Sequence, residues 1–373
     1  MNQPINIIIS GGGTGGHIYP AVAIANALRE LKPDINILFI GANGRMEMEK
    51  VPASGFNIKG IDIIGLQRKL TLSNFLIPYY IFKSVQQVKK IFQTFKPNAV
   101  IGTGGYVSFP VLLTAQLQSI PTYIQEQNAY AGLANKLLAK RTSKIFVAFE
   151  NLEKFFPKDK IIVSGNPVRS DILNLNSIKD DALKFFNLKN NQPVVLVLGG
   201  SLGARTINNT IAENIEFFIQ NNVQLIWQMG KNYFQQISNE LKQKLQQHSI
   251  FFSDFITQMN YAYAASDIII SRAGASTIAE LAIVGKPSIL IPSPNVTDDH
   301  QTKNAMALLQ KNACVLINDG DVKNTLIQNI QTLIKNKELQ QTLSQNIKKF
   351  AKPDSAKIIA QTILNDILNN KSN

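Results

Sequence analysis

Two segments of this 373-residue chain share one pattern: a short apolar run, a glycine-rich turn and then a longer amphipathic stretch. The first apolar run is residues 5–9 with its turn at residues 11–16, and the second is residues 193–198 with its turn at residues 199–204. A buried strand that enters a helix through a glycine-rich loop opens many nucleotide-binding α/β domains. The repetition therefore predicts two Rossmann-like domains of related architecture.

The other apolar runs alternate with longer stretches, as in a parallel sheet covered by helices, so the predicted fold class is α/β. Helices are expected at residues 18–31 and 205–220, directly after the two glycine turns. Further strands are expected at residues 35–40, 99–102, within 117–125, 144–148, 161–163, 224–228, 250–252, 268–271 and 288–291. Near the C-terminus, helices broken at Pro353 are expected.

The turn Gly165-Asn166-Pro167 is the predicted junction between the two domains. We expect an N-terminal domain over residues 1–165 and a C-terminal domain over residues 166–345. Residues 346–373 are expected to form a helical segment that returns toward the N-terminal domain.

Composition and cysteine count exclude several classes of protein. Hydrophobic residues make up 45% of the chain and its mean hydropathy is near zero, which is typical of a globular protein rather than a disordered or membrane-spanning one. Cys314 is the only cysteine, so no disulfide within the chain is expected. No apolar run approaches the roughly 20 residues of a spanning helix, and no basic segment of a signal peptide precedes residues 5–9. We expect a cytosolic protein, or one attached to a membrane from the cytosolic side.

The formal net charge of +13 is concentrated in one region. Residues 63–125 contain no acidic residue, and they carry Arg68, Lys69, Lys83, Lys89, Lys90 and Lys96. Such a region attracts nucleic acid, an anionic bilayer or a diphosphate substrate, and an ordinary basic surface is the simplest alternative. Charge alone leaves the partner open.

The first glycine turn runs from Gly11 to Gly16 and is followed by His17. Its spacing satisfies G-x-G-x-x-G, which lets the backbone approach a phosphate at a helix N-terminus. A dinucleotide site also needs an acidic residue at the end of the second strand, and that strand ends in Gly41-Ala42-Asn43. The missing carboxylate weakens the nicotinamide-dinucleotide interpretation and favours another phosphate site, and the alternative is a tight turn that serves only packing. His17 is a candidate general base, because an unperturbed histidine titrates near neutral pH.

Two more polar turns follow strands of the N-terminal domain. Thr103-Gly104-Gly105-Tyr106 follows the strand at 99–102, so the two glycine turns are expected at one edge of the sheet, where they can share a diphosphate. Gln125-Glu126-Gln127-Asn128 follows another strand, where polar side chains normally point toward a ligand. The alternative for this run is a polar loop with Asn128 as a capping residue.

The C-terminal domain carries its strongest signal in residues 271–287. The turn Gly274-Ala275-Ser276-Thr277 leads from a strand into a helix whose N-terminus suits a pyrophosphate. Glu280 lies one turn further on, where its two oxygens can accept both ribose hydroxyls. Asp298-Asp299-His300-Gln301 is a poor metal site, because adjacent residues rarely converge on one ion. His300 and Gln301 are better candidates for binding sugar hydroxyls.

Taken together, the chain resembles the GT-B-fold N-acetylglucosaminyltransferase family that makes the second lipid-linked precursor of bacterial peptidoglycan. The resemblance extends over essentially the whole chain and is carried, in this order, by GGGTGGH, TGGY, EQN, GNPVR, GGSLGA, RAGASTIAE and DDHQTKNA. It implies two Rossmann-like domains whose parallel sheets face each other across a deep cleft. It also implies transfer of GlcNAc from UDP-GlcNAc to the 4-hydroxyl of undecaprenyl-diphospho-MurNAc-pentapeptide, with inversion, no covalent intermediate, no metal and no cofactor.

The resemblance also implies roles for individual residues. Matching positions that contact the donor UDP-GlcNAc are Thr14, Gly15, Gly16, Asn128, Arg169, Ser201, Ile256, Ala275, Ser276, Thr277, Ile278, Ala279, Glu280, His300 and Gln301. Within this set, the backbone of Ile256 is expected at the uracil, Glu280 at the ribose, and His300 with Gln301 at the GlcNAc hydroxyls. The acceptor diphosphate is expected at Gly13, Thr14, Gly104, Gly105 and Tyr106. His17 and Glu126 both remain candidates for the catalytic base.

Two positions depart from the family pattern. Gln125 stands where relatives often have histidine, which removes one alternative base. Leu202 stands where relatives often have glutamine, so a side-chain contact is expected to be missing.

A polyprenyl-linked acceptor implies docking on the cytoplasmic face of the bacterial inner membrane. The expected membrane patch is Phe75, Leu76, Tyr79, Phe82, Lys83, Lys89 and Lys90. It combines apolar area with bases, as interfacial binding to anionic lipid requires, although some of its apolar residues are expected to belong to the core. Other cell-wall synthesis proteins are further expected partners.

Three alternatives remain open at this point. A GT-B enzyme could use another lipid or a small-molecule acceptor, and an epimerase could act on UDP-GlcNAc with the same fold. A non-enzymatic binding protein is the third, but nucleic acid is not an expected partner because no aromatic residues are interleaved with Arg.

Overall fold

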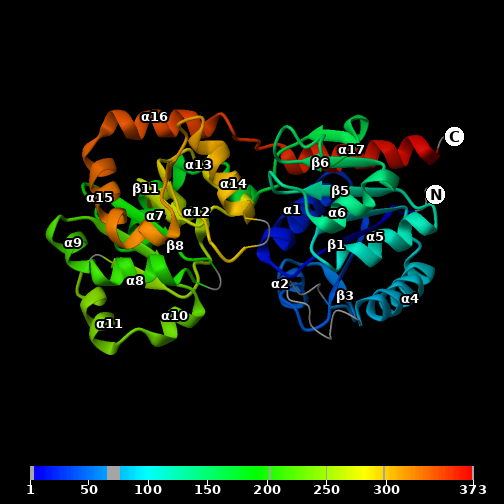
Figure 1. Cartoon of the computed structure of the whole chain (residues 1–373), viewed down its shortest axis with the longest axis horizontal. Helices are drawn as coiled ribbons and strands as arrows, with labels where there is room; N and C mark the ends of the chain where they lie inside the picture. Colours follow the sequence, from blue (N-terminus) through cyan, green and yellow to red (C-terminus); the bar gives the residue numbers. More distant parts are fainter. Residues whose placement is uncertain (1–3, 65–75, 201–202, 249, 297–298, 372–373) are drawn as a thin grey trace. The chain divides into compact units, whose positions relative to one another are not determined.

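The structure is a computed structural model that describes residues 4–64, 76–200, 203–248, 250–296 and 299–371. The chain forms two compact units, labelled by their elements in Figure 1. Unit 1 comprises Met1–Val168 and Lys352–Asn373, and unit 2 comprises Arg169–Ala351. The chain passes from unit 1 to unit 2 after Val168 and returns to unit 1 at Lys352. Both points lie slightly C-terminal to the predicted boundaries at 165/166 and 345/346.

Unit 1 is built on a seven-stranded parallel sheet in the order β3-β2-β1-β4-β5-β6-β7. Its strands are β1 (Asn6–Gly11), β2 (Asn36–Ala42), β3 (Asn57–Ile61), β4 (Ala99–Gly104), β5 (Thr122–Glu126), β6 (Lys144–Val147) and β7 (Ile161–Val163). Its helices are α1 (Gly15–Leu31), α2 (Glu47–Ala53), α4 (Ile77–Phe95), α5 (Ser108–Leu117), α6 (Leu133–Leu138) and α17 (Ser355–Lys371).

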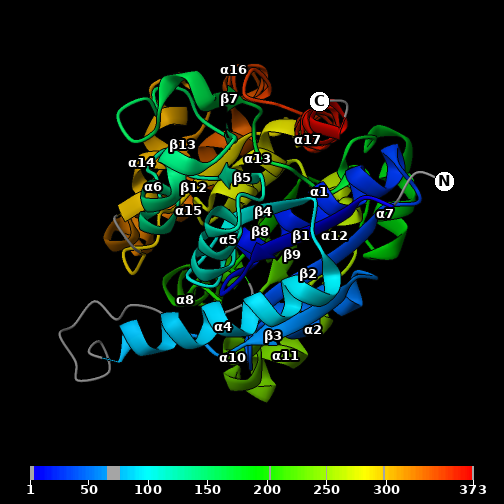
Figure 2. The same ribbon diagram turned by 90° about the vertical axis from the view of Figure 1, so that its right-hand side faces the viewer.

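Helices cover both faces of this sheet. Alternate residues of β1 face opposite sides: Ile7 packs with α1 and α17, whereas Ile8 packs with α4 and α5. Strands buried on both faces need apolar side chains in both directions, which explains why β1 reads as a continuous apolar run. Figure 2 shows α4 beside β3 at the end of the sheet. The last helix, α17, packs against α1 and thus completes the core of unit 1.

Unit 2 is built on a six-stranded parallel sheet in the order β10-β9-β8-β11-β12-β13. Its strands are β8 (Val194–Leu198), β9 (Gln224–Gln228), β10 (Ile250–Ser253), β11 (Ile268–Ser271), β12 (Ser288–Leu290) and β13 (Val315–Leu316). Its helices are α7 (Lys179–Phe185), α8 (Arg205–Glu213), α9 (Ile215–Gln220), α10 (Lys231–Gln236), α11 (Asn239–Gln246), α12 (Met259–Ala265), α13 (Ala275–Val284), α14 (His300–Leu309), α15 (Val322–Lys335) and α16 (Lys337–Lys348).

The structure confirms the predicted α/β class and every predicted strand, with small shifts at the ends. One prediction was wrong: residues 205–220 form two helices, α8 and α9, rather than one. The break lies at Asn214, whose side-chain amide donates to the carbonyl of Thr210 at 2.8 Å and so competes with the regular helix ladder. Two strands, β3 and β13, were not predicted. The first alternates polar with apolar residues at the sheet edge, and the second is only two residues long.

Candidate functional site

The two glycine turns of unit 1 lie together at the carboxyl ends of neighbouring strands, as predicted. β1 pairs with β4, and Gly11 is in register with Gly104. Gly13 (φ 83°), Gly104 (φ 99°) and Gly105 (φ 80°) adopt left-handed conformations that glycine accepts without a steric penalty. A Cβ on Gly105 would lie 2.4 Å from the carbonyl oxygen of Gly12. Only glycine at position 105 therefore lets the second turn pack directly on the first.

The tip of the first turn faces solvent at the start of α1. Gly13 and Thr14 are exposed, whereas Gly15, Gly16 and His17 are half-buried. Thr14 has extended backbone angles and precedes the first helical residue, Gly15, and the first turn of α1 contains no acidic side chain. The positive end of the helix dipole is thus available to an anion. Tyr106, from the second turn, approaches Gly13, and burial raises the pKa of its hydroxyl, which therefore stays protonated.

Glu47 is a residue that sequence reasoning missed. Its side chain is fully buried, and its carboxylate accepts the N–H of Gly13 at 2.9 Å and that of Ala42 at 3.0 Å. A Cβ on Gly12 would lie 2.2 Å from its Oε1. Glu47 therefore ties the first glycine turn to the end of β2. It lies at the start of α2, outside any motif, so no sequence signal marks it.

The hydrogen bonds of His17 determine where its proton lies. Nδ1 is 3.0 Å from the carbonyl oxygen of Thr103 and 3.2 Å from Oε1 of Gln127. Both neighbours are acceptors, so Nδ1 carries the hydrogen and the neutral ring has its lone pair on Nε2. This is the tautomer that a general base at Nε2 requires.

The second candidate base, Glu126, has a different environment. Its carboxylate is buried and accepts the N–H groups of Asn128 (3.1 Å) and Gly132 (2.9 Å) and the side-chain amide of Asn135 (2.9 Å). These bonds hold the loop between β5 and α6. They occupy most of the lone pairs of the carboxylate.

Gln125 also has a structural role. Its amide donates to Asn166 Oδ1 at 2.9 Å, and its Oε1 accepts from Gln127 at 2.5 Å. Asn166 in turn donates to the carbonyl of Gln127 at 3.0 Å. The network links the end of β5 to the GNPVR segment and fixes Gln127 beside His17.

In unit 2, α13 begins directly after the turn that follows β11. Gly274 is extended, and the first turn of α13 carries no acidic side chain, so the dipole of the helix points at the turn. Ser276, Thr277 and Ala279 are half-buried, whereas Ala275 and Ile278 are buried. The hydroxyl side chains of Ser276 and Thr277 therefore lie at the positive end of a helix, where a diphosphate would be stabilised.

Glu280 and Arg169 come together although they are far apart in the sequence. Arg169 Nε lies 3.3 Å from Glu280 Oε1, and the hydroxyl of Tyr263 donates to Glu280 Oε2 at 2.8 Å. Burial raises the pKa of Glu280, and Arg169 and Tyr263 oppose that effect. Tyr263 is a second residue at the site that carries no sequence motif.

The other predicted donor residues are spread over unit 2. His300 and Gln301 begin α14, and Oε1 of Gln301 accepts the N–H of Ser293 at 2.8 Å. Ile256 is buried beyond β10. Ser201, Leu202, Asp298 and Phe75 lie outside the described residues. Among those described, no group of three His, Cys, Asp or Glu side chains is placed to hold a metal ion.

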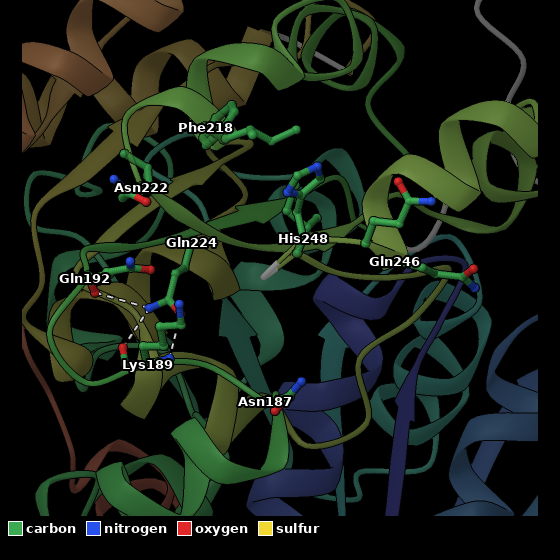
Figure 3. Close-up of a pocket in the computed structure, with 12 residues that line it drawn as sticks. Asn187, Lys189, Gln192, Phe218, Asn222, Gln224, Gln246 and His248 are labelled. Carbon is green, nitrogen blue, oxygen red and sulfur yellow. Dashed lines mark hydrogen bonds between the residues drawn. The ribbon is translucent and has the colours of Figure 1, made fainter.

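A cavity of about 350 Å³ lies at the opposite, amino-terminal edge of the unit 2 sheet. Figure 3 shows Gln224 joined by hydrogen bonds to Lys189 and Gln192, with His248 nearby. Both ends of the Gln224 amide are paired with backbone groups of Lys189. Ligands of open α/β sheets bind at the carboxyl ends of the strands, so this cavity is not the donor site.

Comparison with known proteins agrees with this geometry. Residues 7–147 match the glycosyltransferase family 28 N-terminal domain, and residues 194–359 match its C-terminal domain. A relative from Cytophaga hutchinsonii is 51% identical over 98% of both chains, and one from Flavobacterium psychrophilum is 49% identical over 99% of this chain and 100% of its own. Both are named UDP-N-acetylglucosamine–N-acetylmuramyl-(pentapeptide) pyrophosphoryl-undecaprenol N-acetylglucosamine transferase.

Solved structures show the same fold. The MurG protein of Acinetobacter baumannii superposes with a TM-score of 0.76 at 28% identity, covering 97% of this chain and 100% of its own. A UDP-GlcNAc 2-epimerase from Neisseria meningitidis superposes with a TM-score of 0.65 at 17% identity, over 97% of this chain and 100% of its own, and thus shares the fold alone. The chain belongs to glycosyltransferase family 28 and, within it, to the MurG-type N-acetylglucosamine transferases.

Proposed function

We propose that the chain transfers N-acetylglucosamine from UDP-GlcNAc to the 4-hydroxyl of undecaprenyl-diphospho-MurNAc-pentapeptide, with inversion at the anomeric carbon. The observation that carries this proposal is that α13 of unit 2 places Glu280 about one helical turn after its own N-terminus. Arg169 and Tyr263 hold the carboxylate of Glu280 there. The first turn of α13 would bind the diphosphate through the hydroxyls of Ser276 and Thr277 and the positive end of the helix dipole. The next turn would bind the ribose through the carboxylate of Glu280. The names of relatives about half identical to this chain support the choice of sugar and acceptor.

The acceptor is assigned to unit 1. Its diphosphate would meet the exposed tip at Gly13 and Thr14 and the adjoining turn at Gly104–Tyr106, which is packed against it. Backbone N–H groups at a helix N-terminus bind anions without a counter-charge from a side chain.

His17 supplies the base in this mechanism. Its Nε2 takes the proton of the acceptor hydroxyl as that oxygen forms a bond to the anomeric carbon. The bond from the anomeric carbon to the β-phosphate oxygen breaks, and UDP leaves with the electron pair. The dipole of α13 stabilises the negative charge that develops on the diphosphate.

The first prediction is that release of UDP depends on the acceptor. With UDP-[¹⁴C]GlcNAc and the lipid-linked MurNAc-pentapeptide, we expect one label to enter the lipid fraction for each UDP released. Without acceptor, or with diacylglycerol in its place, we expect the label to stay in UDP-GlcNAc. Release of UDP without transfer, or formation of the 2-epimer, would instead support a hydrolase or an epimerase.

We further propose that α4 docks on the cytoplasmic face of the membrane. Tyr79 and Phe82 of this helix and Leu76, directly before it, are exposed apolar residues, and Phe82 is 63% exposed. Lys90 is exposed nearby, whereas Lys83 is paired with Asp62 at 2.9 Å and contributes less to lipid attraction than predicted. Apolar area with adjacent bases favours an interfacial position on anionic lipid. No helix among the described residues is long and apolar enough to cross a bilayer.

The second prediction tests this surface. The double variant Tyr79→Ser, Phe82→Ser is expected to bind vesicles of anionic phosphatidylglycerol about tenfold more weakly, since two partly inserted aromatic side chains are lost. Leu137→Ser is the matched control, because Leu137 is also 63% exposed but lies on α6. Flotation with the vesicles measures both. An equal loss of vesicle binding in the double variant and in Leu137→Ser would show that α4 is not the docking surface.

A further inference from the structure

Tyr263 is a buried tyrosine that holds the carboxylate assigned to the ribose. It lies on α12 and is 1% exposed. Its hydroxyl donates to Oε2 of Glu280 at 2.8 Å, while Arg169 lies 3.3 Å from Oε1. Two donors from different segments of unit 2 therefore fix one carboxylate, each through a different oxygen.

This arrangement leaves part of the carboxylate available. An ionised carboxylate has about four lone-pair positions, and Tyr263 and Arg169 engage one on each oxygen. The side chain of Glu280 remains 18% exposed, so it can be reached from solvent. The remaining lone pairs then have fixed directions, one on each oxygen, and the two adjacent hydroxyls of a ribose present two donors in matching positions.

The backbone of Tyr263 is fixed as well. Lys286 follows Gly285, which ends α13 in a left-handed conformation. Its Nζ donates to the carbonyl oxygens of Tyr263 at 2.5 Å and Ala264 at 2.9 Å, and also to that of Ser266. The α13 segment thus holds α12 at two points, Glu280 on the tyrosine hydroxyl and Lys286 on the last carbonyls. The phenol ring cannot turn away from Glu280 without breaking the hydrogen bond between the Tyr263 hydroxyl and the Glu280 carboxylate.

Charge states are consistent with this role. Burial and the nearby Glu280 charge raise the pKa of Tyr263 well above its usual value, so the hydroxyl remains a donor at physiological pH. Burial raises the pKa of Glu280, whereas Arg169 and the Tyr263 hydroxyl lower it. Glu280 must be ionised to accept hydrogen bonds from two hydroxyl groups.

We propose that Tyr263 is a positioning residue that orients Glu280 and thereby makes the enzyme select a nucleotide with an intact ribose diol. The proposal rests on the proposed function, because it takes Glu280 as the ribose ligand. Tyr263 itself contacts no substrate in this scheme and acts through Glu280 alone.

The test compares UDP-GlcNAc with its 2′-deoxyribose analogue as donors in the transfer assay. For Tyr263→Phe we expect KM for UDP-GlcNAc to rise about five- to tenfold, with kcat within about twofold, because one hydrogen bond to a charged group is lost. The preference for UDP-GlcNAc over the deoxy analogue should fall by a similar factor. Loss of the donor hydroxyl raises the pKa of Glu280 further, so the acid limb of kcat/KM for the donor should move to higher pH. Tyr261→Phe is the matched control: it removes a hydroxyl from the same helix, where Tyr261 packs against Phe185.

Glu280→Gln and the double variant Tyr263→Phe, Glu280→Gln separate the possible outcomes. If Tyr263 acts through Glu280, its substitution changes nothing further once Glu280 is glutamine. The double variant also lacks the buried charge, so it covers the case in which Tyr263→Phe alone does not fold. Full ribose discrimination and an unmoved pH limb in Tyr263→Phe, or an added loss in the double variant, would overturn this inference. Full discrimination in Glu280→Gln would instead remove the donor assignment itself.

Discussion

Replacing His17 by asparagine is expected to lower kcat for GlcNAc transfer by about 10²–10⁴-fold, with KM for UDP-GlcNAc within about twofold. Asparagine can place an N–H near the position of Nδ1, so the bonds to Thr103 and Gln127 can persist. What it removes is Nε2, the atom that the proposed mechanism uses to take a proton. Transfer in a single turnover, with both substrates saturating, measures the effect directly.

The control for this prediction is His248→Ala. His248 is exposed and lies at the cavity on the amino-terminal edge of the unit 2 sheet, so its loss should leave kcat unchanged. Near-normal turnover of His17→Asn would remove His17 as the base. Glu126 would then be the candidate base, although four N–H donors contact its carboxylate.

Gly105→Ala is expected to reduce transfer by about 100-fold or more and to lower the free energy of unfolding by several kcal/mol. The added Cβ would lie 2.4 Å from the carbonyl oxygen of Gly12, and backbone φ at this position is 80°. A left-handed conformation costs an alanine about 1–2 kcal/mol, and relief of the contact would separate the two glycine turns. Urea unfolding and the KM for the lipid acceptor report the two consequences.

Gly44→Ala separates the contact from the backbone strain. Gly44 is also left-handed, with φ 70°, but its Cβ would meet no atom within 4 Å. The Gly44→Ala variant should therefore lose only the free energy of unfolding that backbone strain costs, about 1–2 kcal/mol. Its transfer activity should be unchanged. If both variants lose activity equally, the packing of the second turn on the first is not what the reaction needs.

The glycine turns and most strands were predictable because each is marked by neighbouring residues. A buried parallel strand is a run of apolar residues, and a turn with positive φ needs glycine, so both leave a local pattern. The order of the strands and the pairing of β1 with β4 then place the two turns of unit 1 together. The same reasoning located α13 and Glu280, since a strand, a glycine and a helix follow one another there.

The remaining features depend on contacts between distant segments. Glu47 has no motif, and its role appears only when α2 brings it under the Gly12–Gly13 turn. The bonds that Glu280 makes with Arg169 and Tyr263 likewise depend on three separate segments of unit 2. Glu126 is predicted as a possible base, and only the fold shows that its carboxylate also holds the loop between β5 and α6. Residue type suggested the chemistry of these side chains, but only the fold shows which of their atoms are already engaged.

The helix α17 has a consequence for the order in which the protein is made. It supplies Ile359, Ile363 and Ile367 to the core that also contains Ile7 of β1. All of unit 2 lies between these two segments in the chain. During synthesis, unit 2 can therefore complete its core while the first unit still lacks a helix. The sheet of unit 1 is therefore translated first but is the last to be fully covered by its helices. Until α17 has been made, one apolar face of this sheet stays partly exposed and is prone to aggregation.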